Sequence, residues 1–229
     1  LQVVNTGRPG QDPEIRIRGT NSINGHKPLY VVDGLFTDNI SHINAADIDR
    51  MEILKDASSL AVFGIAGANG VIIVNTKKAK QGTTTININS SFGVKHVADR
   101  VNLTNAAQFK ELYNEQLMNQ GALPFDYTNW SANTDWQKAI FQNGLVSQNN
   151  VSISSATEKG KYYMSVGYDN DQGAIKKEKM SRVTINLKSD FDVTKNLRFG
   201  FQFNGSRTLP ADAKGVTSAL QAAPIAPMY

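Results

Sequence analysis

Cysteine is absent from this sequence of 229 residues, and no stretch approaches the ~20 consecutive apolar residues that a membrane-spanning helix needs. The first absence excludes disulfide bonds and fits a periplasmic or surface protein without disulfide staples. The second excludes a helical span only. Strands that cross a membrane alternate apolar lipid-facing side chains with polar inward-facing ones, so their average composition is polar. The mean hydropathy of -0.34 is therefore compatible with membrane strands.

A large excess of one charge is also absent, because 24 basic and 20 acidic residues leave a formal net charge of only +4. Basic residues gather in two short clusters, one around Lys77 and Lys78 and one around Lys176 and Lys177. Platforms for single-stranded nucleic acid interleave such charges with aromatic side chains on which bases stack, and neither cluster has them. Both clusters also lie at the ends of predicted strands. We therefore predict solvated strand ends and no nucleic-acid partner.

Residue patterns for catalysis or for metal and cofactor binding are missing as well. The three histidines lie in different predicted elements without metal-ligand spacing. Gly64, Gly67 and Gly70 lack the Lys-Ser/Thr of a phosphate loop and precede a strand, so they are interpreted as turn glycines. The run from Asp169 to Asp171 begins like a calcium loop but lacks the bidentate glutamate. We predict no enzyme activity, no cofactor and no metal site.

Two apolar runs predict a small sheet in the first third of the chain. Leu29–Val32 is β-branched and apolar and ends in Asp33-Gly34, a turn dipeptide whose glycine tolerates positive φ. The second run, Val71–Val74, follows Asn69-Gly70. Neither run alternates with polar residues, so we expect the two strands side by side and buried. The predicted core residues are Val31, Val32, Ile72 and Ile73.

Two short helices are predicted between these strands. Asn44 is a suitable N-cap for a helix over Ala45–Arg50, which we expect to cover the sheet, with a strand possible from Met51 onward. A second helix is predicted over Ser58–Phe63 and is stopped by Gly64.

This region resembles the plug domain of TonB-dependent outer-membrane transporters in the sequences INAADIDRMEILKDASSLAVFG and GANGVIIVNTKK. The sequence IRIRGTNSINGHKPLYVVDG resembles the SusC/RagA branch in particular. The resemblance runs almost continuously from Ile15 to Lys78. One departure is that Phe63-Gly64-Ile65-Ala66-Gly67 stands where relatives usually carry Tyr-Gly-x-Arg-Gly, so the usual positive charge is missing there.

After a charged hinge at Lys77–Gly82 the sequence alternates with a period of two, which predicts strands. Long and short connections alternate between the strands, as in outer-membrane barrels and unlike a soluble sandwich. We expect one face to meet lipid and the other to face inward. The predicted lipid-facing residues are Ile185, Leu187, Phe199 and Phe201, and the predicted inward-facing residues are Thr184, Asn186, Gln202 and Asn204.

The predicted fold class is an α+β plug domain followed by antiparallel transmembrane β-barrel strands. We place the plug at residues 1–82 and the beginning of the barrel at residues 83–229. Both ends are expected to be truncated, since Leu1 begins inside a strand-like run and no closing element follows Pro224. By resemblance, the whole barrel would have roughly 22 strands with a plugged lumen.

The first long connection carries structure of its own. Phe109, Leu112, Tyr113 and Leu117 fall at helical spacing and predict a helix over Ala106–Met118 with Thr104 as N-cap. Two tryptophans, Trp130 and Trp136, offer faces on which a sugar could stack, although an aromatic side chain in a folded loop more often belongs to local core. We favour the core role and keep substrate stacking as the alternative.

The resemblance implies active import of large nutrients, oligosaccharide or peptide, across the outer membrane of a Gram-negative bacterium. Implied partners are a SusD-like lipoprotein lid, TonB with its inner-membrane motor, and outer-membrane lipid. The alternative is a secreted or surface-attached soluble β-rich binding or adhesion protein.

Arg16 and Arg18 alternate with Ile15 and Ile17 and resemble the arginine pair of the family's plug signature. An arginine fork can hold several carboxylate or carbonyl oxygens at once. We expect Arg16 or Arg18 to latch the plug to acidic residues of the barrel wall, most of them in strands beyond Tyr229.

Overall fold

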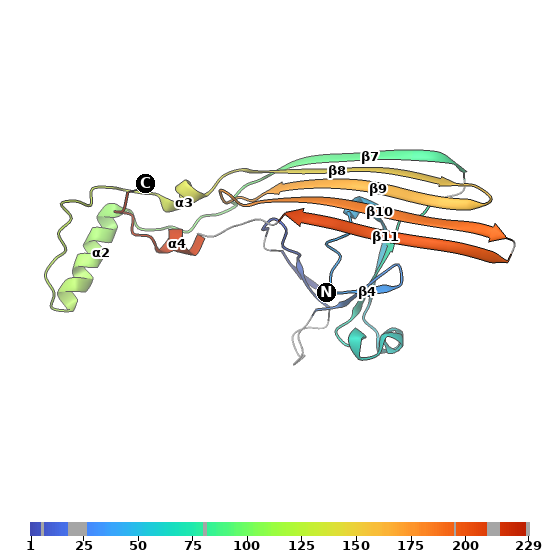
Figure 1. Ribbon diagram of the computed structural model, residues 1–229. Helices are drawn as coiled ribbons and strands as arrows, with labels where there is room; N and C mark the ends of the chain where they lie inside the picture. The colour runs from blue at the N-terminus through green and yellow to red at the C-terminus, as the bar shows by residue number, and fades with distance from the viewer. Residues whose placement is uncertain (6, 18–26, 80–81, 195, 210–215, 228–229) are drawn as a thin grey trace.

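The computed structural model describes residues 1–5, 7–17, 27–79, 82–194, 196–209 and 216–227. Figure 1 shows the N-terminal part (residues 1–79) lying below a sheet of five long strands. Three helices lie beyond one end of this long-stranded sheet: α2 (Ala106–Asn119), α3 (Trp136–Ile140) and α4 (Val216–Gln221). Within the described part of the chain, no helix is long and apolar enough to cross a membrane.

A four-stranded sheet in the order β4-β3-β6-β5 forms the centre of the N-terminal part. Its inner strands, β3 (Leu29–Val32) and β6 (Val71–Thr76), run parallel and side by side, which confirms the pairing predicted from their apolar sequences. The edge strands β4 (Leu35–Thr37) and β5 (Ile48–Leu54) run antiparallel to them. A separate antiparallel pair precedes this sheet: β1 (Gln2–Val4) and β2 (Glu14–Arg16).

The two faces of this small sheet carry two apolar clusters, because successive side chains of a strand point to opposite faces. Val32 and Ile72 belong to a cluster that Ile43 helps to close. Val31 belongs to the other cluster, which is closed by Leu60, and Ile73 is half-buried against it. Leu60 ends the short helix α1 (Ala57–Leu60), which continues into the 3-10 helix η2 (Ala61–Gly67).

The prediction of a helix over Ala45–Arg50 is wrong, because the helical segment is only three residues long. Only a 3-10 turn, η1 (Ala45–Asp47), forms behind the predicted N-cap Asn44, whose Oδ1 accepts a hydrogen bond of 2.8 Å from the Ala46 amide. Ile48 already pairs with Thr76 as the first residue of β5. Hydrogen bonding to β6 and burial of Ile48 beside the first cluster outweigh the local helical spacing, so no helix of the predicted length covers the sheet.

The long-stranded sheet has the order β11-β10-β9-β8-β7, and all neighbours are antiparallel. The alternation with a period of two that predicts strands after the hinge lies in these five strands. The connections alternate as predicted, with residues 96–143 and 173–178 at one end and the shorter connections that follow Ala156 and Thr194 at the other. The strands are β7 (Gly82–Lys95), β8 (Gly144–Ala156), β9 (Gly160–Gln172), β10 (Lys179–Thr194) and β11 (Leu197–Leu209).

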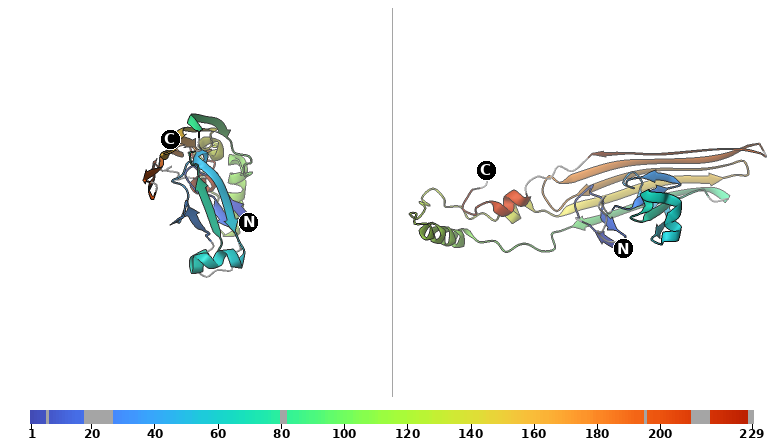
Figure 2. Two further views of the ribbon diagram at one scale, coloured as in Figure 1. Left: turned by 90° about the vertical axis from the view of Figure 1, so that its right-hand side faces the viewer. Right: turned by 90° about the horizontal axis from the view of Figure 1, so that it is seen from below.

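The polarity of this sheet is the reverse of a soluble protein's. Apolar side chains point away from the N-terminal part and are exposed, for example Phe199 at 58% and Ile185 at 39%. Polar side chains point toward the N-terminal part, where Thr184 and Asn186 are only 3% and 4% exposed. The end-on view in Figure 2 shows the N-terminal part against one side of the sheet only. The predicted division of the two faces is therefore observed.

The long connection after β7 contains the predicted helix, α2, but its N-cap is one residue later than expected. Asn105, not Thr104, accepts a hydrogen bond from the Gln108 amide, and the Gln108 side chain accepts one from the Asn105 amide. This reciprocal capping box satisfies two amides, which is why the helix begins behind Asn105. The helix packs on its own loop, with the Tyr113 and Phe125 rings 6.0 Å apart.

Candidate functional site: the polar interface between the two sheets

The N-terminal part meets the long-stranded sheet through buried polar side chains instead of a shared apolar core. The long strands contribute Asn150, Ser152, Ser165, Thr184, Asn186 and Lys188, each less than one-tenth exposed. The N-terminal part contributes two carboxylates, Asp33 and Asp47. A buried polar group costs free energy unless it is hydrogen-bonded, so the partners of these two carboxylates define how the two parts are joined.

Asp33 is held in place by the turn between β3 and β4. Its φ is 47° and that of Gly34 is 91°, the left-handed pair of a two-residue hairpin turn. The Asp33 carboxylate accepts hydrogen bonds from the amide and hydroxyl of Thr76, at 3.0 and 2.6 Å, and is thereby fixed to the neighbouring strand end.

Lys188 on β10 forms a buried ion pair with Asp33. Its Nζ lies 2.9 Å from Asp33 Oδ2, with the two side chains 9% and 5% exposed. The same ammonium donates to Thr76 Oγ1 at 2.8 Å, and Gln202 of β11 donates to Asp33 Oδ2 at 2.9 Å. Two long strands therefore converge on one carboxylate.

The pKa of Asp33 is lowered in this environment. Burial acts to raise it, but hydrogen bonds from Thr76 and Lys188 and the charge of Lys188 together outweigh burial. The carboxylate is thus charged at neutral pH, and the contact with Lys188 is an ion pair.

Asp47 forms the second anchor and is 1% exposed. It ends η1, which places its carboxylate against β8 and β9. The carboxylate accepts hydrogen bonds from the Tyr163 hydroxyl at 2.9 Å, from Asn150 Nδ2 at 3.3 Å, and from the Ser165 hydroxyl. Three neutral donors from two strands therefore surround this carboxylate.

A third contact joins the loop between β1 and β2 to the end of the sheet with the long connections. Arg8 Nε lies 3.1 Å from Glu178 Oε1, and the Glu178 side chain is only 3% exposed. Nearby, Lys95 of β7 pairs with Asp171 of β9 at 2.6 Å. This contact is more exposed than the Asp33 and Asp47 anchors, since the Arg8 side chain is 52% exposed.

Of the two arginines expected to latch the plug, the structure describes only Arg16. Arg16 pairs with Glu14 on its own strand, at 2.6 Å between Nη2 and Oε1. Arg18 lies outside the described residues. A partner for either arginine on strands beyond this chain stays a prediction.

Sequence reasoning missed Asp33, Asp47 and Lys188 as interface residues. The sequence analysis assigns Asp33 only to a turn and assigns no interface role to Asp47. Lys188 carried the available signal, because it is a basic residue among inward-facing polar ones and needs an acidic partner once that face is covered.

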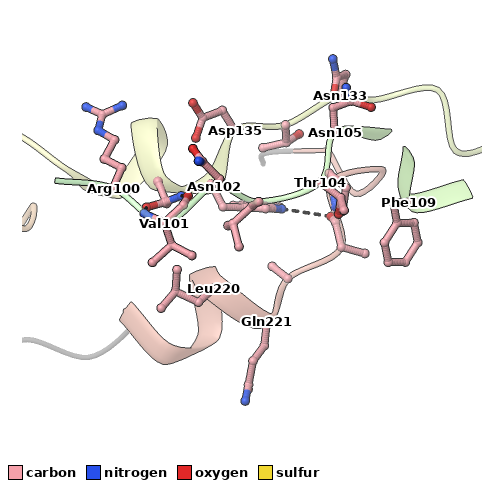
Figure 3. A pocket seen from close by; sticks show the side chains of 17 residues that line it. Arg100, Val101, Asn102, Thr104, Asn105, Phe109, Asn133, Asp135, Leu220 and Gln221 are labelled. Carbon is pink, nitrogen blue, oxygen red and sulfur yellow. Dashed lines mark hydrogen bonds between the residues drawn. The ribbon is translucent and has the colours of Figure 1, made fainter. Parts of the chain in front are cut away.

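A cavity of about 530 Å³ next to Trp136 lies among the long connection, α3 and α4. In Figure 3, Arg100, Val101 and Asn102 line it from the long connection, and Leu220 and Gln221 line it from α4.

Polar groups that line this cavity already serve local structure. Gln137 exchanges hydrogen bonds with both backbone groups of Val101, and Asp135 caps α3 through the Lys138 amide. Trp136 donates its indole N–H to the Ala223 carbonyl at 3.0 Å. Trp130 is not among the lining residues and packs edge-on to Phe125. Substrate stacking by either tryptophan stays a prediction.

Among the described residues, no three histidine, aspartate, glutamate or cysteine side chains cluster in a way that could hold a metal ion.

Comparison with known proteins identifies this architecture. The model of the TonB-dependent receptor plug domain matches residues 1–71. TonB-dependent receptor P3 of Formosa agariphila is 36% identical over 91% of this chain and 20% of the relative. SusC of Bacteroides thetaiotaomicron is 34% identical over 99% of this chain and 24% of the relative. The RagAB peptide importer in its open-open state superposes with a TM-score of 0.75 at 25% identity, over 92% of this chain and 28% of that chain.

A plug domain packed against long antiparallel strands defines a TonB-dependent receptor. The similarity of this chain to SusC and to the RagAB importer is more specific, and the chain belongs to the SusC/RagA family of these receptors. It spans about a fifth to a quarter of the length of the curated relatives, at 20% and 24%. We call the N-terminal part the plug and the five long strands the wall strands.

The buried pair predicts strong coupling between Asp33 and Lys188. Asp33→Asn and Lys188→Met should each lower the free energy of plug release by about 3–5 kcal/mol, because each leaves one buried charge without its partner. The double variant should lose much less than the sum. The measurement is a urea titration of the purified full-length receptor, with protease access to the plug as readout. Arg198→Gln, which breaks the exposed Arg198–Asp192 pair, is the matched control and should leave the free energy of plug release nearly unchanged. Additive effects of the two buried substitutions would contradict the pairing.

The lowered pKa of Asp33 predicts how plug retention depends on pH. A carboxyl whose pKa is lower in the folded protein than in the unfolded chain stabilises the folded, docked state above its unfolded pKa, about 3.9, and this contribution is lost as pH falls through the folded pKa. The contribution of Asp33 to plug retention should therefore be constant from about pH 7 to pH 5 and should decrease below about pH 4. In Asp33→Asn, the loss of plug retention at acid pH should be smaller. An unchanged loss at acid pH in this variant would show that other groups cause it.

Proposed function

We propose that this chain supplies the plug and the first wall strands of an outer-membrane importer for large nutrients. TonB-dependent receptors are outer-membrane proteins of Gram-negative bacteria. The whole importer would take up an oligosaccharide or a peptide, work with a SusD-like surface lipoprotein, and draw its energy from TonB.

The reversed polarity of the wall strands carries this proposal. Their exposed face presents large apolar side chains such as Ile88 and Phe199, at 74% and 58% exposed, whereas their covered face is polar. Water would disfavour such an exposed face, but hydrocarbon favours it. Lipid on one side and a hydrated lumen with a plug on the other satisfy both faces.

The alternative, a soluble β-rich binding or adhesion protein, predicts the opposite arrangement. A soluble sandwich buries its apolar faces between two sheets and exposes its polar faces. Here the apolar face of the wall strands has no second sheet against it among the described residues, and no observation favours this alternative.

Lipid on the outer face also requires the wall to close. β7 and β11 are the edge strands of the wall sheet in the described part of the chain. Unpaired backbone groups in hydrocarbon cost several kcal/mol each, so we infer that further strands of the whole protein pair with both edges and complete a barrel around the plug.

The plug anchors suit a closed resting state. Ion pairing at Asp33 and hydrogen bonding at Asp47 hold the plug at neutral pH, yet both consist of groups that water can solvate once the surfaces separate. The outer membrane holds no ion gradient of its own, so energy must come from the inner membrane. There, each charge moved through ~100 mV yields ~2.3 kcal/mol. A TonB-driven pull would supply the work of separation.

Lipid exposure of the wall strands predicts a face-specific cost of charge. Ile185→Arg should lower folding stability in lipid vesicles by about 2–4 kcal/mol, because it places a cation in the hydrocarbon. The control is Ser206→Arg. Ser206 pairs with Thr184 on the polar face, one residue from Ile185, so the substitution should cost much less. Equal tolerance at the two positions would remove the support for a membrane wall.

Import itself is tested by growth and uptake. Deletion of the gene should abolish growth on one large oligosaccharide or peptide but not on its monomers, and the full-length gene should restore growth only in a strain with intact TonB. Purification of the tagged receptor should bring down a SusD-like lipoprotein. Normal growth of the deletion strain on every such substrate, together with recovery of the receptor from the aqueous fraction of the parent strain, would contradict the proposal.

A further inference from the structure

Four basic side chains gather at the end of the wall sheet that carries the long connections. Lys176 and Lys177 lie in the connection between β9 and β10, Lys179 begins β10, and Arg207 lies close to the end of β11. All four residues are exposed, and we call them the basic rim. Figure 1 shows this end of the wall sheet pointing toward α3.

The two rim residues that belong to strands lie on the outward face of the wall, away from the plug. Met180 is 6% exposed and lies close to the plug, since its Cγ atom is 3.1 Å from the place that a Cβ atom on Gly10 would take. Lys179 precedes Met180 in the strand and therefore points to the opposite face. Arg207 pairs with Val183, one of the exposed apolar residues of that outward face.

Two acidic side chains of β9 and of the connection after it point to the plug side and already have partners. Glu178 is 3% exposed and pairs with Arg8 of the plug. Asp171 pairs with Lys95 at 2.6 Å. Within the described ranges, none of the four rim side chains forms an ion pair. Positive charge on the outward face is therefore left without a protein partner.

The outward face changes from apolar to basic in a regular order toward the rim. Along β10 the outward residues are Leu187, Ile185, Val183, Ser181 and Lys179. On β9 their paired neighbours are Val166, Tyr168 and Asn170. The tyrosine suits a membrane–water interface, because its ring is apolar and its hydroxyl is polar. Apolar, aromatic, neutral polar and charged groups thus follow one another as they do from the acyl chains to the headgroups of a lipid leaflet.

The opposite end of the wall sheet does not share this excess of positive charge in the part of the chain that the structure describes. Glu158 and Asp192 accompany Lys159 and Arg198 there, and Arg198 pairs with Asp192 at 2.7 Å. The unpaired cations therefore belong to one leaflet only.

A lipid headgroup matches this surface better than a soluble anion or an acidic protein. The ligand must match both the cations and the apolar surface beside them, and a lipid carries an anionic group together with acyl chains. Basic residues next to a membrane attract anionic lipids. Arg207 can hold phosphate oxygens with its planar fork, and Lys179 adds a point charge. Asn170 and Ser181 can bind the hydroxyl groups of a saccharide.

We propose that the basic rim binds the phosphorylated saccharide headgroup of a glycolipid in the outer leaflet around the receptor, with its acyl chains on the apolar face below. Long connections of membrane barrels lie outside the cell, so this end of the wall lies at the outer leaflet. The inference rests on the proposed outer-membrane location and adds a lipid partner that does not depend on the cargo.

Lipid A, a phosphorylated glycolipid, is the probe for the first experiment. Native mass spectrometry of the purified full-length receptor in neutral detergent measures its binding, which we expect to be saturable. Lys179→Gln combined with Arg207→Gln should weaken binding about thirtyfold, because each cation near a membrane surface contributes about fivefold to affinity. Lipid A without its phosphates should bind the native receptor more weakly by a similar factor. Equal binding of the two lipids would overturn the proposal.

Two further variant pairs control this measurement. Lys159→Gln combined with Lys161→Gln removes two exposed lysines from the opposite end of the wall sheet and should leave lipid A binding unchanged. Lys179→Arg combined with Arg207→Lys keeps both charges and should retain binding. Heat-shifted gel migration shows that each variant barrel is folded. An equal loss of binding in the control pair would contradict a specific site.

Growth on the cargo separates this inference from the proposed import. A strain that carries the Lys179→Gln and Arg207→Gln receptor should grow normally although lipid A binding is weakened, because the rim faces outward and not into the lumen. The two proposals therefore fail separately. Native affinity of the double variant for lipid A overturns the lipid site, and normal growth of the deletion strain contradicts import.

Discussion

The buried ion pair between Asp33 and Lys188 is the contact on which the joining of plug and wall depends. It lies where β3, β6, β10 and β11 meet, because Thr76 and Gln202 bind the same carboxylate. Neither charge is stable in this environment without the other. The hairpin turn that fixes Asp33 and the strand register that fixes Lys188 must therefore both be correct before the two parts fit.

Two different kinds of burial stabilise this molecule. Inside the plug, apolar side chains such as Val71, Ile72 and Val74 are removed from water and form ordinary packed clusters. Between plug and wall, burial involves carboxylates, hydroxyls and amides instead. Loss of apolar contacts on separation costs free energy with no substitute, whereas water can replace hydrogen-bonding partners. The plug can thus remain a cohesive body while its attachment to the wall stays reversible.

Much of this organisation could be predicted from the sequence, because period and composition determine it locally. Apolar runs at Leu29–Val32 and Val71–Val74 predicted the parallel pair, and period-two alternation predicted the two faces of the long strands. The helix over Ala45–Arg50 failed because β6, more than twenty residues further along, offers Ile48 a pairing partner that local spacing does not reveal.

The anchors could not be predicted for a related reason. Asp33 and Lys188 are far apart in the chain and become partners only through the docking of one sheet on another. A single sequence shows that each is polar, but it does not show which distant residue each will meet. The family resemblance predicts a latch at Arg16 or Arg18, whereas the observed partner of Arg16 is Glu14, two residues away.

The parallel arrangement of β3 and β6 has a mechanical consequence. The chain enters β3 at Leu29 from the N-terminal side and leaves β6 at Thr76 toward the wall strands. Tension between the N-terminus and the wall would draw these two strands in opposite directions along their own axes. Their hydrogen bonds would then be loaded together in shear and not opened one after another, so this strand pair should be the most force-resistant element of the plug.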